Sequence, residues 1–213
     1  MDLSKVMISE SLNSVLHQLN ESGRAAVLDM IKTYHDQYKE MSAEEEPENL
    51  AYSVHVSIDE IVDEQERQTL SHHPDKSVSC RSGCSFCCFQ SVDVTKDEAR
   101  LLLMASKENG VKIDRERLKR QAEAGLNGFQ ALPLSDRRCV FLGQDNKCTV
   151  YEYRPVACRK LVVTSKPEFC DTETNPGAQI EKIVSVEAEA ISAAMCTAVD
   201  SGIMGEMILK SKP

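Results

Sequence analysis

The sequence predicts a mainly α-helical protein with a small β-hairpin, built around an irregular, cysteine-rich metal-binding core. Three observations support this fold class. Apolar residues recur at helical spacing near both ends of the 213-residue chain. One central segment alternates β-forming residues on either side of a polar turn. Eight of the nine cysteines fall between Cys80 and Cys170, which is far denser than ordinary core packing requires.

The first 75 residues are predicted to form an N-terminal helical region. Apolar residues from Ile8 to Leu19 predict one amphipathic helix, and those from Val27 to Met41 predict a second after a break at residues 21–23. The acidic run 43–48 contains Pro47 and predicts a turn. Alternation over residues 52–56 predicts a short strand, and Ser57 then begins a helix over residues 58–70.

The remaining residues, 76–213, are predicted to form a cysteine-cluster metal-binding domain with a C-terminal helix. Thr95 and Glu98 match a capping box for a helix that Gly110 ends. Asp114 begins another helix, which stops near Gly125. Residues 139–151 predict the hairpin, with its turn at Gly-Gln-Asp-Asn. The last helix is expected over residues 179–199.

The cysteines are the main functional signal. The acidic N-terminus lacks the features of a secretory signal, so we expect a cytoplasmic protein whose thiols stay reduced. Reduced thiols at short spacing favour zinc or an iron–sulfur centre over disulfides. Eight thiols fit two four-cysteine sites, or one cluster plus one zinc, and the sequence leaves their pairing open. The ninth, Cys196, is expected to be a packing residue.

Charge narrows the set of partners. The net charge of −9 disfavours nucleic acid and anionic membrane surfaces, and no apolar run approaches the ~20 residues of a membrane span. The segment from Arg137 to Lys160 nevertheless holds six basic residues and only two acids. Positive neighbours suit an anionic metal–thiolate centre. Within this segment Arg154 is predicted to contact thiolates, an anion or Glu152.

Three runs of residues resemble a known family. They are Cys80-x3-Cys84-x2-Cys87-Cys88, then Cys139-Val-Phe-Leu, then Cys148-Thr-Val-Tyr-Glu-Tyr-Arg-Pro-Val-Ala-Cys158-Arg159. Together they are similar to the YkgJ-type cysteine-cluster proteins, also called the CxxCxxCC family of zinc- or iron-chelating domains. The resemblance covers about residues 78–172, and its first gap is three residues here instead of two. It implies metal chelation, with metal ligands at Cys80, Cys84, Cys87, Cys88, Cys139, Cys148, Cys158 and Cys170.

Three functions fit these residues. The first is a cytosolic metal-binding protein holding zinc or an iron–sulfur cluster such as [4Fe–4S]. The second is an iron–sulfur enzyme, either S-adenosylmethionine-dependent, from a likeness of Cys80–Cys87 to the radical-enzyme loop, or methylase-like, from a cluster shared with flagellin lysine N-methylases. The third is a structural zinc module that binds a protein partner. No catalytic residue is assigned, and His72 and His73 are expected at an exposed helix end.

Overall fold

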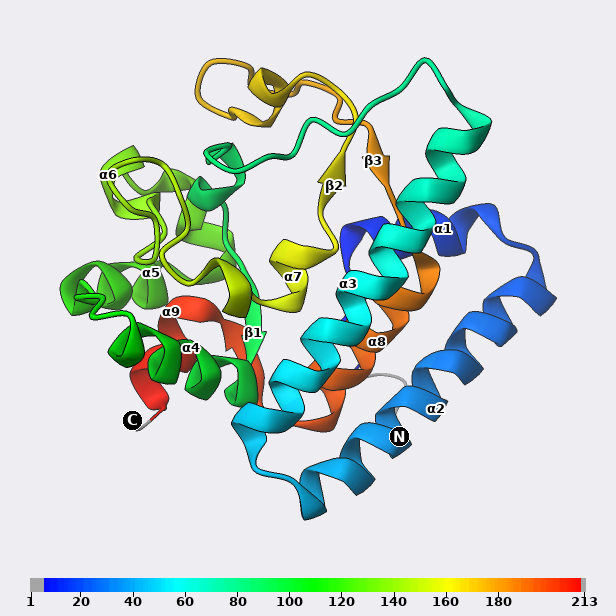
Figure 1. Ribbon diagram of the computed structural model, residues 1–213, viewed down its shortest axis with the longest axis horizontal. Helices are drawn as coiled ribbons and strands as arrows, with labels where there is room; N and C mark the ends of the chain where they lie inside the picture. Colours follow the sequence, from blue (N-terminus) through cyan, green and yellow to red (C-terminus); the bar gives the residue numbers. More distant parts are fainter. Residues whose placement is uncertain (1–5, 212–213) are drawn as a thin grey trace.

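The computed structural model describes residues 6–211, and most of these lie in helices (Figure 1). The α-helices are α1 (Glu10–Gln18), α2 (Glu21–Glu44), α3 (Pro47–His72), α4 (Lys96–Glu108), α5 (Arg115–Gly128), α6 (Leu134–Arg137), α7 (Val156–Arg159), α8 (Val186–Ala198) and α9 (Met204–Lys210). Single turns of 3-10 helix are η2 (Phe86–Phe89), η3 (Phe129–Ala131), η4 (Tyr151–Tyr153) and η5 (Pro167–Cys170). None of the described helices combines the length and apolarity needed to cross a membrane.

The two predicted N-terminal helices are present as α1 and α2. Their boundary lies slightly earlier than predicted, because Asn20 caps α2 by accepting a hydrogen bond from the Gly23 N–H. The predicted turn at Pro47 is also present, since α2 ends at Glu44 and Pro47 occupies the first turn of α3. Proline suits that position because its missing N–H has no helical partner there.

The strand predicted at residues 52–56 and the helix start predicted at Ser57 are both wrong. Helix α3 runs through this whole segment. Its buried side chains recur at helical spacing and face the rest of the molecule, whereas Tyr52 and Val56 face outward. Those buried residues are Leu50, Ala51, His55, Ile58 and Val62. The longer 3.6-residue stripe therefore prevails over three alternating β-forming residues, because burial of a whole helix face outweighs local strand propensity.

The predicted helices after the cysteine-rich loop are confirmed. Both hydrogen bonds of the capping box between Thr95 and Glu98 begin α4, and Gly110 follows its end with φ 64°. Asp114 caps α5. Gly125 adopts φ 61° and kinks α5, which continues to Gly128 and so runs past the predicted end.

The strands form two small antiparallel pairs. Strand β1 (Asp93–Thr95) pairs with β4 (Ser201–Ile203), and β2 (Val162–Val163) pairs with β3 (Lys182–Ile183). The hairpin predicted at 139–151 is not a strand pair, because its backbone makes only one bridge, between Leu142 and Cys148. Several residues of that segment are instead tied into short turns.

The last predicted helix begins too early. Residues 182–183 form β3, and α8 starts only at Val186, where the Ser185 hydroxyl accepts from the Ala188 N–H. Helix α9 was not predicted. Its burial against α4 and α5 accounts for it, since this contact is made between residues far apart in the sequence.

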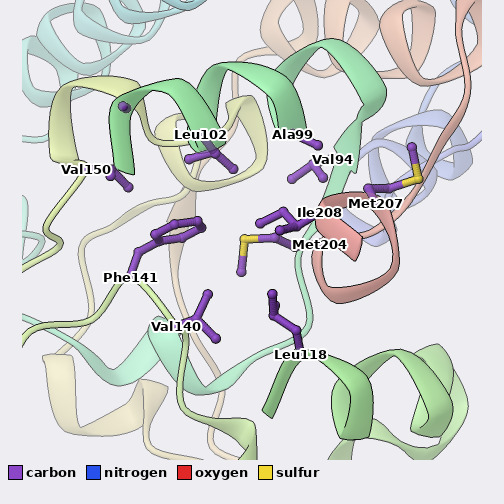
Figure 2. Close-up of a cluster of buried hydrophobic side chains, with 11 residues drawn as sticks. Val94, Ala99, Leu102, Leu118, Val140, Phe141, Val150, Met204, Met207 and Ile208 are labelled. Carbon is purple, nitrogen blue, oxygen red and sulfur yellow. The ribbon is translucent and has the colours of Figure 1, made fainter. Parts of the chain in front are cut away.

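Three clusters of buried side chains form the core. The first joins α4, α5 and α9 with the turn at residues 140–150, and Figure 2 shows Phe141 directed toward Met204 within it. The second lies between α3, α8 and the β2–β3 pair. The third packs α1 and α2 on the alanine-rich face of α8. Cys139 and Cys148 pack against the first cluster, whereas Val156 of the cysteine-bearing helix α7 belongs to the second.

Candidate metal centre

Seven of the eight predicted ligands line one cavity of about 630 Å³. They come from the loop before β1, the turn at residues 139–148 and helix α7. These residues are Cys80, Cys84, Cys87, Cys88, Cys139, Cys148 and Cys158. Cys196 of α8, which was expected to be a packing residue, is partly buried and also lines the cavity. The fold thus brings together thiols from separate parts of the chain.

One group of thiols, called here the outer group, consists of Cys80, Cys84 and Cys170. The Cys80 Sγ accepts a hydrogen bond from the Val163 N–H of β2 at 3.4 Å. Cys170 ends η5, which packs against η2. Burial, followed by the charges of Cys80, Cys84 and Cys87, raises the pKa of Cys170 to about 11. Cys170 is thus close enough to Cys80, Cys84 and Cys87 for their charges to contribute to its pKa.

A second group, called here the inner group, consists of Cys139, Cys148 and Cys158. The Cys139 N–H donates to the Cys88 carbonyl at 2.8 Å. Burial, with further contributions from Cys148 and Cys87, raises the pKa of Cys139 to about 12. Burial also raises the pKa of Cys158 well above its usual range, and the charges of Cys139, Cys87 and Cys148 add to this effect.

Cys87 and Cys88 lie between the two groups. Both belong to η2, a single turn of 3-10 helix, and not to an extended chain that would point them apart. The neighbouring Cys88 thiol, followed by burial, raises the pKa of Cys87. Cys87 influences the pKa of members of both the inner and the outer group. Cys87 and Cys88 are therefore placed where each could add a fourth thiol to one of the two groups.

The thiols share a cavity without forming a preassembled ligand set. Across residues 6–211, no three His, Cys, Asp or Glu side chains converge closely enough to hold a metal ion. Burial raises the pKa of Cys139, Cys148 and Cys158 and thereby favours the protonated thiol. A metal must therefore displace protons as it binds, and coordination itself would draw the sulfurs together.

Unpartnered hydrogen-bond donors test whether a metal–thiolate centre suits this cavity. Within the described part of the chain, Ser91 Oγ, Arg137 Nε and Arg154 Nε are buried and have no hydrogen-bond partner. All three residues line the same cavity as the thiols. A centre with four thiolates carries negative charge and accepts hydrogen bonds at sulfur. The residues present therefore fit a metal–thiolate centre.

The loop that carries Cys170 is attached to the rest of the site by polar contacts. Arg137, which is 2% exposed, forms an ion pair with Glu173 and donates to Gln130 Oε1 at 2.7 Å. Gln130 in turn donates to Gln90, and Gln90 donates to Thr172 at 3.2 Å. These hydrogen bonds connect the end of η2 to the loop between β2 and β3, which lies at the top of Figure 1.

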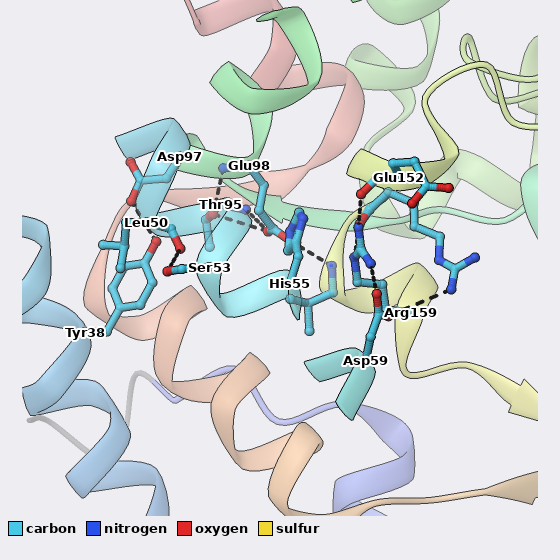
Figure 3. A network of polar contacts seen from close by, with 12 residues as sticks. Tyr38, Leu50, Ser53, His55, Asp59, Thr95, Asp97, Glu98, Glu152 and Arg159 are labelled. Atoms are coloured by element: carbon cyan, nitrogen blue, oxygen red, sulfur yellow. Dashed lines mark hydrogen bonds and ion pairs between the residues drawn. The ribbon is translucent and has the colours of Figure 1, made fainter. Parts of the chain in front are cut away.

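The basic segment noted in the sequence, residues 137–160, carries the three cysteines of the inner group. Arg154 does not pair with Glu152; its guanidinium lies 4.1 Å from the Tyr151 ring centroid, and its Nη2 lies 3.9 Å from Asp59. Arg159 is buried, donates to the carbonyls of Glu152 and Arg154, and pairs with Asp59 (Figure 3). Asp59 on α3 thus forms ion pairs with both arginines, and no sequence pattern predicted this role.

A second set of contacts was also missed. The buried Glu98 carboxylate contacts His55 of α3 and the Val156 N–H of α7 (Figure 3). The capping-box pattern identified Glu98, but it accounts for only one of the two carboxylate oxygens. The histidines predicted outside the site are where they were expected: α3 ends at His72, and both His72 and His73 are exposed.

Comparison with known proteins gives one match. The family model described as "CxxCxxCC: Putative zinc- or iron-chelating domain" matches residues 79–190, which is more than half of the chain. No curated protein and no solved structure matches the chain. The matched segment contains all eight predicted ligands, from Cys80 to Cys170. The cavity that seven of them line extends beyond this segment, since Asp59 and Cys196 also line it. The chain belongs to the CxxCxxCC family of zinc- or iron-chelating domains.

Proposed function

We propose that this protein binds zinc or iron through its eight clustered cysteines, in two neighbouring centres, in the reducing environment of the cytoplasm. The observation that carries the proposal is that thiols from three separate segments line one cavity together with unpartnered buried donors. The zinc- or iron-chelating family supports the choice of metals.

The arrangement of the thiols suggests how they divide. The outer centre would use Cys80, Cys84 and Cys170, and the inner centre Cys139, Cys148 and Cys158. Cys87 and Cys88, which lie between the two groups, would each complete one centre. Four thiolates suit either zinc or an iron–sulfur cluster such as [4Fe–4S]. Bound zinc would stabilise the fold, whereas a bound iron–sulfur cluster would transfer electrons.

Metal content of variants tests both the function and the division. Protein purified without air is analysed for zinc, iron and sulfide, and its iron is examined by Mössbauer and EPR spectroscopy. Two centres predict that Cys84→Ser and Cys158→Ser each remove about half of the bound metal, because each breaks one four-thiolate set. Cys196→Ser, a matched control from the same cavity, should leave metal content unchanged.

Each result has a clear reading. Complete loss of bound metal in both Cys84→Ser and Cys158→Ser would show that the cysteines form a single centre. Unchanged metal content in Cys84→Ser and Cys158→Ser would refute the ligand assignment. A wild-type protein that is folded but free of metal after anaerobic purification would refute the function itself.

A second candidate function is an enzyme that binds a small molecule beside the metal. The cavity volume of about 630 Å³ favours it, because small-molecule sites span roughly 300–1,000 Å³. The likeness to radical S-adenosylmethionine enzymes gains no support from the fold, because the strands described in residues 6–211 form only two antiparallel pairs and no parallel barrel. Calorimetric titration of the metal-loaded protein with S-adenosylmethionine distinguishes the two functions. Saturable binding would support the enzyme, and no binding would exclude S-adenosylmethionine as its cofactor.

A further inference from the structure

The Glu98 carboxylate connects three helices at one buried point. Its Oε2 accepts from the Thr95 N–H at 2.9 Å and from the Thr95 hydroxyl at 3.2 Å, at the start of α4. Its Oε1 accepts from the Val156 N–H of α7 at 2.8 Å and from His55 Nε2 of α3 at 3.1 Å. A buried carboxylate with four donors is fully satisfied, so its position is fixed (Figure 3).

Helix α7 depends on such contacts for its position. It has only four residues, Val156–Arg159, and a helix of one turn is not stable by itself. The Glu98 carboxylate accepts a hydrogen bond from the Val156 N–H. This is the first N–H available at the start of the helix, since Pro155 has none. Asp59 holds its last residue through the ion pair with Arg159. Cys158 lies between these two attachments and lines the cavity.

Both attachments lead back to α3. His55 and Asp59 are four residues apart and therefore lie on the same face of that helix. Helix α3 ends at His72, before the family-matched segment begins at residue 79. One face of a helix outside the family domain thus contacts the single turn that carries an inner-group thiol.

We propose that His55 and Glu98 are positioning residues for the Cys158 thiol, so that α3 forms part of the inner metal centre. The inference rests on the proposed metal-binding function. Glu98 acts on Cys158 through the Val156 backbone, and His55 keeps the Glu98 Oε1 directed at that backbone. Loss of an outer hydrogen-bond partner typically weakens metal binding by about 10–100-fold.

The test compares two substitutions at one position. His55→Leu removes the donor, whereas His55→Gln keeps an N–H donor on a side chain of similar length. Tyr38→Phe is the matched control: it removes a hydroxyl that donates to Asp97 at 2.8 Å in the same network, and that bond does not involve α7. Zinc affinity is measured by competition with a chromophoric chelator, at a temperature where all four proteins are folded.

We expect His55→Leu to weaken binding of about half of the zinc by at least about 10-fold. His55→Gln should stay close to wild type. Tyr38→Phe should lower thermal stability without changing affinity. In cobalt-loaded protein, His55→Leu should also lose part of the thiolate-to-cobalt charge-transfer absorbance, which a purely structural role would not change.

Val156→Pro provides an independent test if His55→Leu fails to fold. It removes the N–H that donates to Glu98 and leaves the residues of α3 unchanged. Proline is tolerated in the first turn of a helix. Val156→Pro should weaken binding of the same half of the zinc. Wild-type affinity in folded His55→Leu or Val156→Pro overturns this inference while leaving the proposed function intact. A wild-type protein that binds no metal overturns both.

Discussion

At the residue scale, Arg159 shows how a buried charge is accommodated beside the inner group. Its Nε donates to the Arg154 carbonyl at 2.7 Å, and its two terminal nitrogens contact Asp59 and the Glu152 carbonyl. Burial lowers the pKa of Arg159, and the charge of Asp59 opposes this shift. A planar guanidinium can make all three contacts at once, and an ammonium on a flexible chain cannot reproduce that geometry.

Arg159→Lys should therefore lower the free energy of unfolding by about 2 kcal/mol, because at least one buried carbonyl loses its donor. Urea denaturation of the metal-free protein measures the change. Arg67→Lys is the control, since Arg67 pairs with Glu64 on the exposed side of α3 and the unfolding midpoint should not move. Equal effects at both positions would contradict the role given to the buried contacts.

Glu98 gives the protein a defined response to acid. Burial by itself raises its pKa, but hydrogen bonds from His55, Thr95 and Val156 outweigh burial, so the pKa of Glu98 lies below its ordinary value of 4.5. A carboxyl with a lowered folded-state pKa stabilises the protein above its unfolded-state pKa, and this stabilisation is lost as pH falls through the folded-state pKa.

We therefore expect the stability difference between wild type and Glu98→Gln to be largest above about pH 5 and to shrink below pH 4.5. Urea denaturation of the metal-free proteins at several pH values measures this difference. A difference that stays constant down to acid unfolding would show that the Glu98 charge does not contribute.

At the scale of single elements, local signals predicted some boundaries well. Thr95 and Glu98 identified the start of α4, and Gly110 and Asp114 identified the end of that helix and the start of α5, because capping depends on neighbouring residues alone. The hairpin at 139–151 and the full length of α3 were mispredicted. Their outcome depends on contacts with distant elements, which no local pattern records.

Gly110 offers a test at this scale. Its φ of 64° is a left-handed conformation that an L-side chain adopts with strain, although there is space for a Cβ. Gly110→Ala should lower the free energy of unfolding by about 1 kcal/mol. Gly110→Asn should cost less, because asparagine tolerates this conformation. Thermal and urea unfolding distinguish them, and an Ala variant as stable as wild type would contradict the strain argument.

At the scale of the whole molecule, the predicted boundary near residue 75 falls between elements that pack together. Helix α2 lies along α8, and α3 lies against α4 and α7. Ile31 of α2 is fully buried against the alanines of α8, and Leu50 of α3 packs in the second core cluster. The cysteines were readily found from their density. The contacts that His55 and Asp59 of α3 make beside them were not predicted, because these residues lie far from the cysteines in sequence.

This packing predicts one cooperative unfolding transition for the whole chain. Ile31→Ala should lower its midpoint, with a cost of about 2–5 kcal/mol, because a cavity forms between α2 and α8. Circular dichroism and tyrosine fluorescence should report the same transition. Two separate transitions, with only one affected by Ile31→Ala, would instead support an independent N-terminal domain.

The pairing of β1 with β4 also determines when the site is completed during synthesis. Strand β1 follows directly after the Cys87–Cys88 turn, whereas its partner lies near the far end of the described sequence. The ribosome therefore releases every clustered thiol before it releases the strand that pairs with β1. The complete arrangement of thiols around the cavity therefore forms only after residues 201–203 have been synthesised and β4 has paired with β1.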